Sequence, residues 1–335
     1  MQFLKRYLLP RLVQFVVVIF IGATVVFIIP RLTPNDPIER QLANLTTRGA
    51  YLDSATIGKI KQTLRELYGL EGTFLQQYGL FWERLFHGDF GPSFSHFPTP
   101  VTTLIRNSMP WTIGLMLITT FLSWAIGSLL GGLAGSFRRA KWARAIEIFS
   151  MTIRPVPYYI MALALVILFA YVFPVFPMIG GYSVKLKGAV TLKYVLDVVR
   201  HAFLPAISLV LTGFGTWFLQ MRSVTFTVVA EDYVTYAEAA GVPRGKIVTQ
   251  YITRNAILPQ VTGLALSLGF IFGGALITEQ VFAYPGIGTL LYNAVISSDY
   301  NVIMGITVYS IVSIAVAVLV IDLIYPLLDP RVRHR

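Results

Sequence analysis

LVQFVVVIFIGATVVFII, residues 12–29, is an apolar run in which Gln14 is the one strongly polar side chain. A helix needs about 20 apolar residues to cross the hydrocarbon core of a bilayer. Basic residues precede the run, as they do in a signal peptide, but no small-residue cleavage site follows it. The run therefore predicts an uncleaved membrane span at the beginning of the fold.

The composition of all 335 residues fits a membrane protein. Hydrophobic residues make up 55% of the chain, and charged residues make up 13%, which is about half the share of a soluble domain. This balance excludes a disordered chain, a nucleic-acid-binding arm and an ordinary soluble enzyme. Because the sequence has no cysteine, it can form neither a disulfide framework nor a thiolate metal site.

Five further segments have the length and hydropathy of membrane spans. Together with the first, they predict an all-α integral membrane protein with six transmembrane helices. Arg154, Glu279 and Asp322 lie near predicted span ends, so they are expected to snorkel or to pair at the interface. The five segments are residues 111–135, 156–173, 202–221, 257–277 and 302–321.

Basic residues predict which side of the membrane each loop occupies, because short cytoplasmic loops are enriched in Lys and Arg. When both termini are placed in the cytoplasm, the inside segments hold just over half of the 27 Lys and Arg residues. The net charge of +11 therefore needs no nucleic-acid partner to explain it. The inside residues are Lys5, Arg6, Arg11, Arg138, Arg139, Lys141, Arg144, Arg222, Arg244, Lys246, Arg254, Arg331, Arg333 and Arg335.

Glycines recur at every fourth residue in two of the spans. Gly127, Gly131 and Gly135 form two overlapping G-x-x-x-G patterns, and Gly269 and Gly273 form another. Such stripes let helix backbones approach closely. We therefore expect both spans to pack tightly, each against a helix that the sequence does not identify.

The extracytoplasmic segment 31–106 is too long for a simple connection, so we expect it to have structure of its own. One part of it predicts an amphipathic helix capped by Ser54 or Thr56. A later part is aromatic and is typical of a membrane interface. The stripe of the helix is Ile57, Ile60, Leu64 and Leu67, and the aromatic part is Phe81, Trp82, Leu85 and Phe86.

A second loop, residues 222–256, lies on the predicted cytoplasmic side and is too polar to span the membrane. Asp232 can cap a short helix there, and Gly241 with Pro243 would end that helix and turn the chain. A second short helix is predicted from Arg244 towards Pro259. Two short helices joined by a sharp turn can enter a groove on a soluble partner.

At this loop the sequence resembles the permease subunits of ATP-binding-cassette importers, in the branch that carries dipeptides, oligopeptides and nickel. Their "EAA" loop has an alanine-rich helix, a fixed glycine and a downstream Leu-Pro, which Ala237, Gly241 and Pro259 match. The letters Glu238-Ala239-Ala240 adjoin Gly241 directly, so only Ala237 keeps its family position when the glycines are aligned. Further motifs follow the family order: RLTPNDP at 31–37, GDFGPS at 88–93, YPGIG at 284–288, SDYNV at 298–302, DLIY at 322–325 and DPR at 329–331.

The resemblance implies a type I importer permease that forms half of a translocation pathway in a prokaryotic cytoplasmic membrane. The implied partners are a homologous second permease subunit, two ATP-binding-cassette ATPases, an extracytoplasmic substrate-binding protein and membrane lipid. This chain would hold no cofactor, since it lacks a phosphate-binding loop and the ATPases would bind ATP and Mg²⁺. The implied cargo is di- or oligopeptides, with oligosaccharides or nickel complexes as alternatives.

The resemblance also assigns a coupling role to one set of residues in the cytoplasmic loop. Within it, Glu238 is either a contact to the ATPase or a solvated charge, and Gly241 is either part of the coupling turn or an ordinary helix cap. The chain then divides into the first span with its cytoplasmic N-terminus (1–30), the extracytoplasmic segment (31–106), a five-helix core (107–330) and a cytoplasmic tail (331–335). The coupling residues are Asp232, Tyr233, Ala237, Glu238, Gly241, Pro243 and Pro259.

Two other functional classes fit the sequence less well. An ion-coupled secondary transporter would need buried titratable groups, which are scarce here, and the sequence offers no convincing inverted repeat. An intramembrane enzyme is disfavoured because neither H-E-x-x-H nor G-x-S-x-G occurs and the histidines lack ligand spacing. We therefore assign no catalytic or metal-binding residue, and the substrate pathway stays unassigned. The histidines are His87, His96, His201 and His334.

Overall fold

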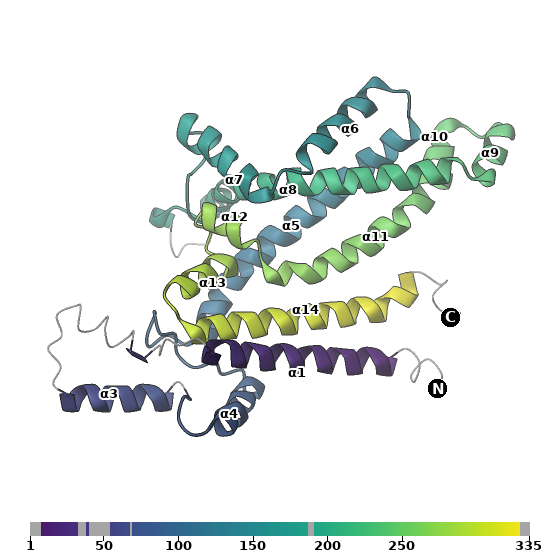
Figure 1. Ribbon diagram of the computed structural model, residues 1–335. Coiled ribbons are helices and arrows are strands. Elements are labelled where there is room, and N and C mark those ends of the chain that lie inside the picture. Colours follow the sequence, from purple (N-terminus) through teal and green to yellow (C-terminus); the bar gives the residue numbers. More distant parts are fainter. Residues whose placement is uncertain (1–7, 33–37, 40–53, 68, 187–190, 329–335) are drawn as a thin grey trace. The chain divides into compact units, whose positions relative to one another are not determined.

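The computed structural model describes residues 8–32, 38–39, 54–67, 69–186 and 191–328, and its elements in these ranges are helices (Figure 1). The motif residues 33–37 and 329–331, the tail 331–335 and His334 lie outside the described residues. The chain forms two compact units: Met1–Pro110 with Gly286–Leu323, and Trp111–Pro285 with Ile324–Arg335.

Five helices among the described residues are long and apolar enough to cross a membrane. A sixth span results when Lys141–Ile153 and Tyr158–Val172, which meet at a bend of 98°, are taken as one. The six-helix prediction is confirmed in this sense, and the predicted third span falls in the second half of the bent pair. The five helices are α1 (Leu9–Leu32), α5 (Val101–Ser136), α8 (Leu192–Val229), the helix Arg244–Gly273 and α14 (Tyr300–Leu328).

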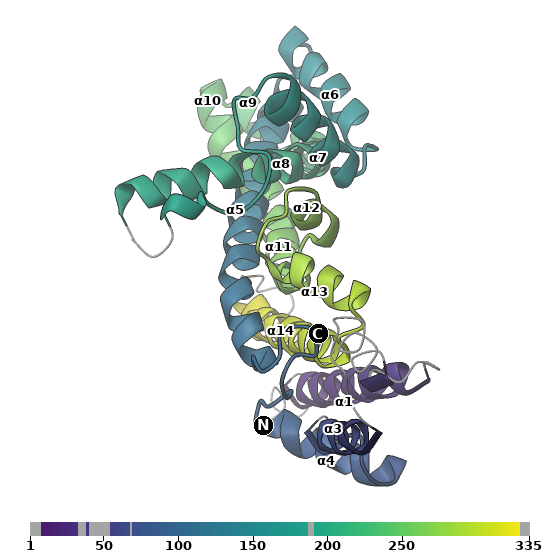
Figure 2. The ribbon, with the colours of Figure 1, turned by 90° about the vertical axis from the view of Figure 1, so that its left-hand side faces the viewer.

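Shorter helices connect these spans. In the first unit they are α3 (Ser54–Leu67), α4 (Phe74–Phe86) and α13 (Ile287–Ile296). In the second unit α6 (Lys141–Ile153) and α7 (Tyr158–Val166) pack along α8 (Figures 1 and 2). The elements of the second unit are α6 (Lys141–Ile153), α7 (Tyr158–Val166), η2 (Ile167–Val172), η3 (Val184–Leu186), α9 (Asp232–Ala239), α10 (Arg244–Lys246), η4 (Ile247–Thr253), α11 (Arg254–Gly269), η5 (Phe270–Gly273) and α12 (Leu276–Val281).

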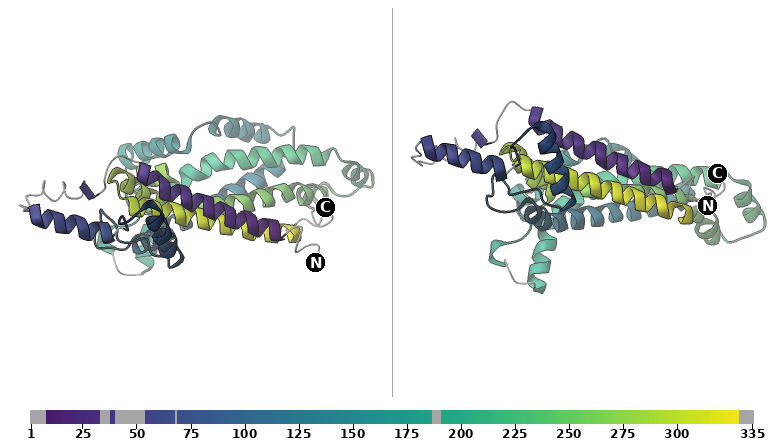
Figure 3. Two further views of the ribbon diagram at one scale, coloured as in Figure 1. Left: turned by 60° about the horizontal axis from the view of Figure 1, so that its bottom comes forward. Right: turned by 90° about the horizontal axis from the view of Figure 1, so that it is seen from below.

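In the first unit α1 and α14 lie side by side and antiparallel (Figures 1 and 3). A Cβ on Gly22 would come within 3.0 Å of the Ile311 side chain, so the two backbones approach closely. Nearer the start of α1, Arg11 forms an ion pair with Asp322 at 3.2 Å. The pairing predicted for Asp322 is thus confirmed, while its position at the membrane interface stays a prediction.

Segment 31–106 contains the predicted amphipathic helix, α3. The helix runs from Ser54, so both candidate caps lie within its first turn, and the capping prediction stays untested because residues 51–53 lie outside the described residues. The aromatic part belongs to α4, whose rings contact α1: Phe81 lies 5.2 Å from Phe27, and Trp82 stacks on Phe20 at 5.4 Å. Aromatic contacts therefore hold α4 against the first span.

Two of the family-like motifs meet in the first unit. The carboxylate of Asp299, which is fully buried, accepts hydrogen bonds from the hydroxyl of Ser93 and from the backbone N–H and hydroxyl of Ser95. Its other oxygen accepts the Val302 N–H at 3.2 Å and so caps the start of α14. Asn301 donates to the Pro92 carbonyl at 2.9 Å. These bonds tie residues 88–95 to the loop that precedes α14.

The first glycine stripe packs against α8. Cβ atoms on Gly127 and Gly135 would come within 2.6 Å of Trp217 and Thr225 respectively, which confirms the predicted close approach. For the second stripe, the prediction of close packing is wrong at Gly273, where an added Cβ would meet nothing within 4 Å. On that helix it is Gly263 that faces the indole of Trp217, at 3.1 Å.

The remaining ionisable residues near span ends behave differently from each other. Arg154 is exposed and ends α6 at the bend, as expected for a residue at an interface. Glu279 is fully buried, and its carboxylate accepts the Thr112 hydroxyl at 2.8 Å. This burial contradicts the prediction that Glu279 snorkels, and the hydrogen bond from Thr112 satisfies the carboxylate inside the protein.

Candidate functional site

The short helix α9 of the predicted cytoplasmic loop begins one residue earlier than its sequence cap suggests. Glu231 occupies the N-cap position without a side-chain hydrogen bond, and Asp232 is the first helical residue. The prediction that Asp232 caps the helix is therefore wrong. Its carboxylate still lies in the first turn, where the helix dipole favours negative charge.

Gly241 ends α9 as predicted. Its φ of +75° is a left-handed conformation that only glycine adopts without strain. Its N–H donates to the Glu238 carbonyl at 3.0 Å, and the next N–H, of Val242, donates to the Ala237 carbonyl at 3.1 Å. Pro243 then occupies the N-cap position of α10, so the turn and the following helix start are both defined locally.

The second helix of the loop is not a separate short element. α10, η4, α11 and η5 follow one another without a gap, so Arg244–Gly273 is one membrane-spanning helix. Pro259 lies inside it and does not end it. The predicted boundary between a loop helix and the fifth span is therefore wrong. The turn after α9 therefore leads directly into a helix long enough to cross a membrane.

A small apolar core holds α9 on this span. Val234 and Ala237, which are 1% and 7% exposed, pack against side chains of the π-helical turn η4. Sequence reasoning assigned Ala237 but missed its partners, although their i, i+1, i+5 spacing marks one apolar face. The partners are Ile247, Val248 and Ile252.

The opposite face of α9 is open. Tyr236 is 73% exposed and Tyr233 is 39% exposed. Partial burial and the nearby Glu231 carboxylate raise the pKa of Tyr233, and a hydrogen bond from Asn255 opposes them. Both tyrosines present amphipathic rings, and such residues are favoured in protein interfaces.

Glu238 and Arg244 form an ion pair across the turn, with both side chains about half exposed. Arg244 also donates to the Ser136 carbonyl at the end of α5, at 3.3 Å. Glu238 is thus neither simply solvated nor wholly available to a partner. The pair links α9, α10 and the end of α5 within the second unit.

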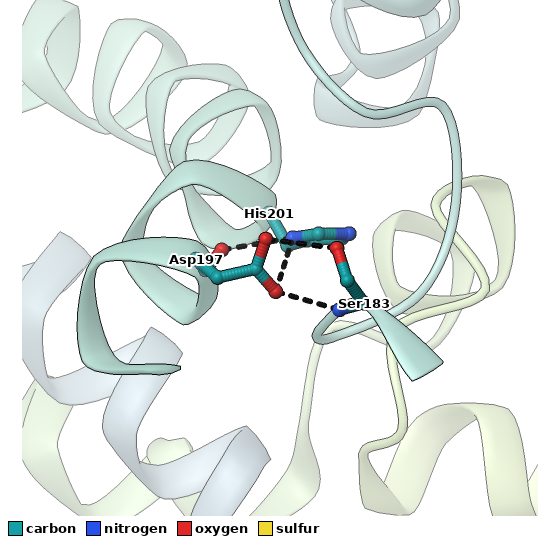
Figure 4. Close-up of polar contacts among 3 residues, drawn as sticks. All are labelled: Ser183, Asp197 and His201. Atoms are coloured by element: carbon teal, nitrogen blue, oxygen red, sulfur yellow. Dashed lines mark hydrogen bonds and ion pairs between the residues drawn. The ribbon is translucent and has the colours of Figure 1, made fainter. Parts of the chain in front are cut away.

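A separate polar cluster lies at the start of α8 (Figure 4). The Asp197 carboxylate accepts the Ser183 N–H at 2.6 Å and the Ser183 hydroxyl at 2.9 Å. His201 Nδ1 lies 2.8 Å from the Asp197 carbonyl oxygen and 3.6 Å from the carboxylate. A hydrolytic triad needs the imidazole between nucleophile and carboxylate. Here the carboxylate lies between them, so the cluster tethers the preceding loop and does not activate Ser183.

The described residues contain no group of three or more His, Cys, Asp or Glu side chains that would hold a metal ion. His201 belongs to the tether just described, and His87 bonds the Glu83 carbonyl on its own helix. Among the polar groups described, the exposed face of α9 is thus the feature best suited to binding a soluble partner.

Comparison with known proteins defines the class. Residues 127–334 match the family described as binding-protein-dependent transport system inner membrane component. The match covers more than half of the chain and includes α8, the whole loop 222–256 and α11. The chain belongs to this family. It is therefore the membrane permease component of an ATP-binding-cassette importer and not an enzyme, and ATP hydrolysis belongs to partner ATPases.

Individual relatives extend the similarity over almost the full length. The chain is 31% identical to the probable D,D-dipeptide transport system permease protein of Escherichia coli, over 94% of each chain. It is 29% identical to an oligopeptide transport system permease protein of Bacillus subtilis, over 94% of this chain and 96% of the relative. An oligopeptide transport system permease protein of Haemophilus influenzae is 26% identical over 98% and 99%.

Proposed function

We propose that this permease forms half of the translocation pathway of an ATP-driven importer of di- or oligopeptides. The relatives that align with nearly the whole chain are described as peptide permeases, and this is the observation that supports the proposed cargo. Oligosaccharides and nickel complexes are the alternative cargoes of the branch. The scarcity of membrane ionisable groups argues against ion-coupled transport.

The complete importer would contain a homologous second permease subunit, two ATP-binding-cassette ATPases and an extracytoplasmic substrate-binding protein. It would lie in a prokaryotic cytoplasmic membrane with both termini of this chain inside. ATP and Mg²⁺ would bind to the ATPases. This arrangement places the loop 222–256 on the same side of the membrane as the ATPases.

We further propose that α9 is the element that docks on an ATPase. Tyr233 and Tyr236 supply the exposed contact face, while Val234 and Ala237 fix the helix on η4. Closure of the ATPases would move α9, and the continuous helix Arg244–Gly273 would carry that movement into the membrane. A shift between inward- and outward-facing states then follows from the different ATPase contacts in the two states.

Co-purification tests the docking face. Tyr236→Asp places a charge in the centre of the proposed interface, so the ATPases should no longer purify with the full-length permease. Gln250→Asp is the matched control, because Gln250 is also exposed but lies on η4. Equal ATPase recovery with both variants would contradict docking through α9.

Ligand retention by the cognate binding protein tests the cargo. The binding protein would be purified without denaturation, and its bound ligand identified by mass spectrometry. Peptides should be recovered, and peptide uptake into liposomes containing the complete importer should depend on ATP. Recovery of an oligosaccharide or a nickel complex, with no peptide uptake, would replace the proposed cargo and leave the permease assignment unchanged.

A further inference from the structure

A cavity of about 260 Å³ lies between α1 and α14 in the first unit. Apolar side chains from both helices form most of its lining, and three polar side chains occupy one end. Arg11 pairs there with Asp322 and also donates to Gln14 at 3.3 Å. The apolar lining includes Phe15, Val18, Ile311, Ile314, Ala315 and Leu319.

The shape of this cavity suits a hydrocarbon chain with a charged head. Its α14 wall runs from Ile311 to Asp322, which is about 16 Å at the rise of an α-helix. Both walls belong to membrane-spanning helices, so lipid acyl chains are the apolar molecules present at the highest concentration around it. The polar end would then lie where a lipid headgroup lies.

Charge selects the kind of headgroup. An arginine has five N–H donors in a fixed fork, so Arg11 can bind a phosphate oxygen and keep its bond to Asp322. The sequence beside both helix ends is basic, and basic clusters next to a membrane helix attract anionic lipids. The flanking basic residues are Lys5 and Arg6 before α1, and Arg331, Arg333 and Arg335 after α14, with Asp329 the acidic residue among them.

We propose that the α1–α14 cavity binds one acyl chain of an anionic phospholipid, whose phosphate lies on Arg11. This site is distinct from the α9 face and needs no particular cargo. It gives the first span a bound lipid at the place where that span packs on the last one. A helix of another subunit is the competing occupant, and the experiment separates the two.

Native mass spectrometry of the full-length permease tests the site. The protein would be reconstituted in nanodiscs of equal parts phosphatidylglycerol and phosphatidylethanolamine, released and partly delipidated. Wild type should retain one phosphatidylglycerol in preference to phosphatidylethanolamine. Arg11→Gln should lower that preference about fivefold, the factor expected for one basic residue at a membrane surface.

Two tryptophan substitutions on α1 form a matched pair. Val18→Trp fills the cavity and should abolish selective retention, whereas Val17→Trp should not, because Val17 is equally exposed but does not line the cavity. Asp322→Asn breaks the ion pair but keeps Arg11, and should retain the lipid. Equal lipid retention in the two tryptophan variants would overturn the proposal. Loss of a co-purifying second permease only in Val18→Trp, with unchanged lipid, would assign the cavity to a protein helix instead.

Discussion

Gly131 of α5 lies so close to α8 that an added Cβ would stand 2.4 Å from the carbonyl oxygen of Phe218. The atom that it would strike belongs to the backbone, so no side-chain rotation can relieve the contact. One turn to either side, Cβ atoms added to Gly127 and Gly135 would come within 2.6 Å of the Trp217 and Thr225 side chains of α8. The α5–α8 contact thus depends on three positions without side chains, as expected where helices associate inside a membrane.

Gly131→Ala should therefore destabilise the second unit. Forcing a methyl group into a packed contact costs about 1–3 kcal/mol, because one helix must move. Thermal unfolding of the purified permease in detergent measures the loss. Gly114→Ala is the control on the same helix, since its Cβ meets nothing within 4 Å and alanine favours a helix. A lower unfolding temperature for Gly114→Ala than for Gly131→Ala would contradict this packing.

Gly241→Val should uncouple transport from ATP hydrolysis more than it affects stability. An added Cβ meets no neighbour there, so the cost is the backbone strain of φ +75°, about 1–2 kcal/mol. Relief of that strain would turn α9 away from η4. Gly241→Asn should restore much of the function, because asparagine tolerates this conformation. Uptake and subunit assembly, measured separately, distinguish coupling from misfolding. Valine and asparagine variants with equal uptake would show that the turn conformation does not matter.

Asp299→Ala should destabilise the first unit by about 2–3 kcal/mol. It removes four hydrogen-bond acceptor contacts, including the cap of α14, and leaves the buried hydroxyl of Ser93 and the donors of the exposed Ser95 without this acceptor. Asp299→Asn keeps part of the network and should lose less. Ser297→Ala, at an exposed helix end, is the nearby control. Denaturant unfolding in detergent gives the difference, and an alanine variant as stable as wild type would refute the role of this carboxylate.

Two ion pairs of the second unit should contribute differently to the free energy of unfolding. Arg222 pairs with Glu147, and the two side chains are only 16% and 20% exposed, whereas the Glu238–Arg244 pair is 45% and 48% exposed. Glu147→Ala leaves a mostly buried guanidinium without its carboxylate and should cost about 2–3 kcal/mol. Glu238→Ala should cost less than about 1 kcal/mol. The unfolding free energies of the single and double variants of each pair measure the two contributions. A larger loss for Glu238→Ala than for Glu147→Ala would show that burial does not determine the strength of these pairs.

Local sequence patterns predicted the membrane spans and one of the close helix contacts. The spans follow from hydropathy. The spacing of Gly127, Gly131 and Gly135 predicts close packing because it can be read from the sequence of a single helix. The identity of the partner, α8, is a long-range relation that no local spacing contains. For the same reason the burial of Glu279 escaped prediction: position along a span does not reveal that Thr112 donates to its carboxylate.

Helix ends were the least predictable feature. Pro259 suggested a boundary, yet it lies inside a helix, as do Pro30, Pro110 and Pro205. In a membrane, neighbouring helices and local π or 3₁₀ turns satisfy the carbonyls that a proline frees, so proline ends a helix less reliably than in water. At Gly241, by contrast, the turn was predictable because its left-handed backbone is a local requirement of one residue.

The proposed role of α9 is to couple this permease to ATP hydrolysis. Its most direct test is the ATP hydrolysis rate of the complete importer in liposomes, with and without substrate-loaded binding protein. The charge-reversed helix carries Glu231→Lys and Asp232→Lys, both at exposed positions, and Lys59→Glu on α3 is the control. Substrate should stimulate hydrolysis in wild type and control but not in the charge-reversed variant. Undiminished stimulation in that variant would contradict coupling through α9.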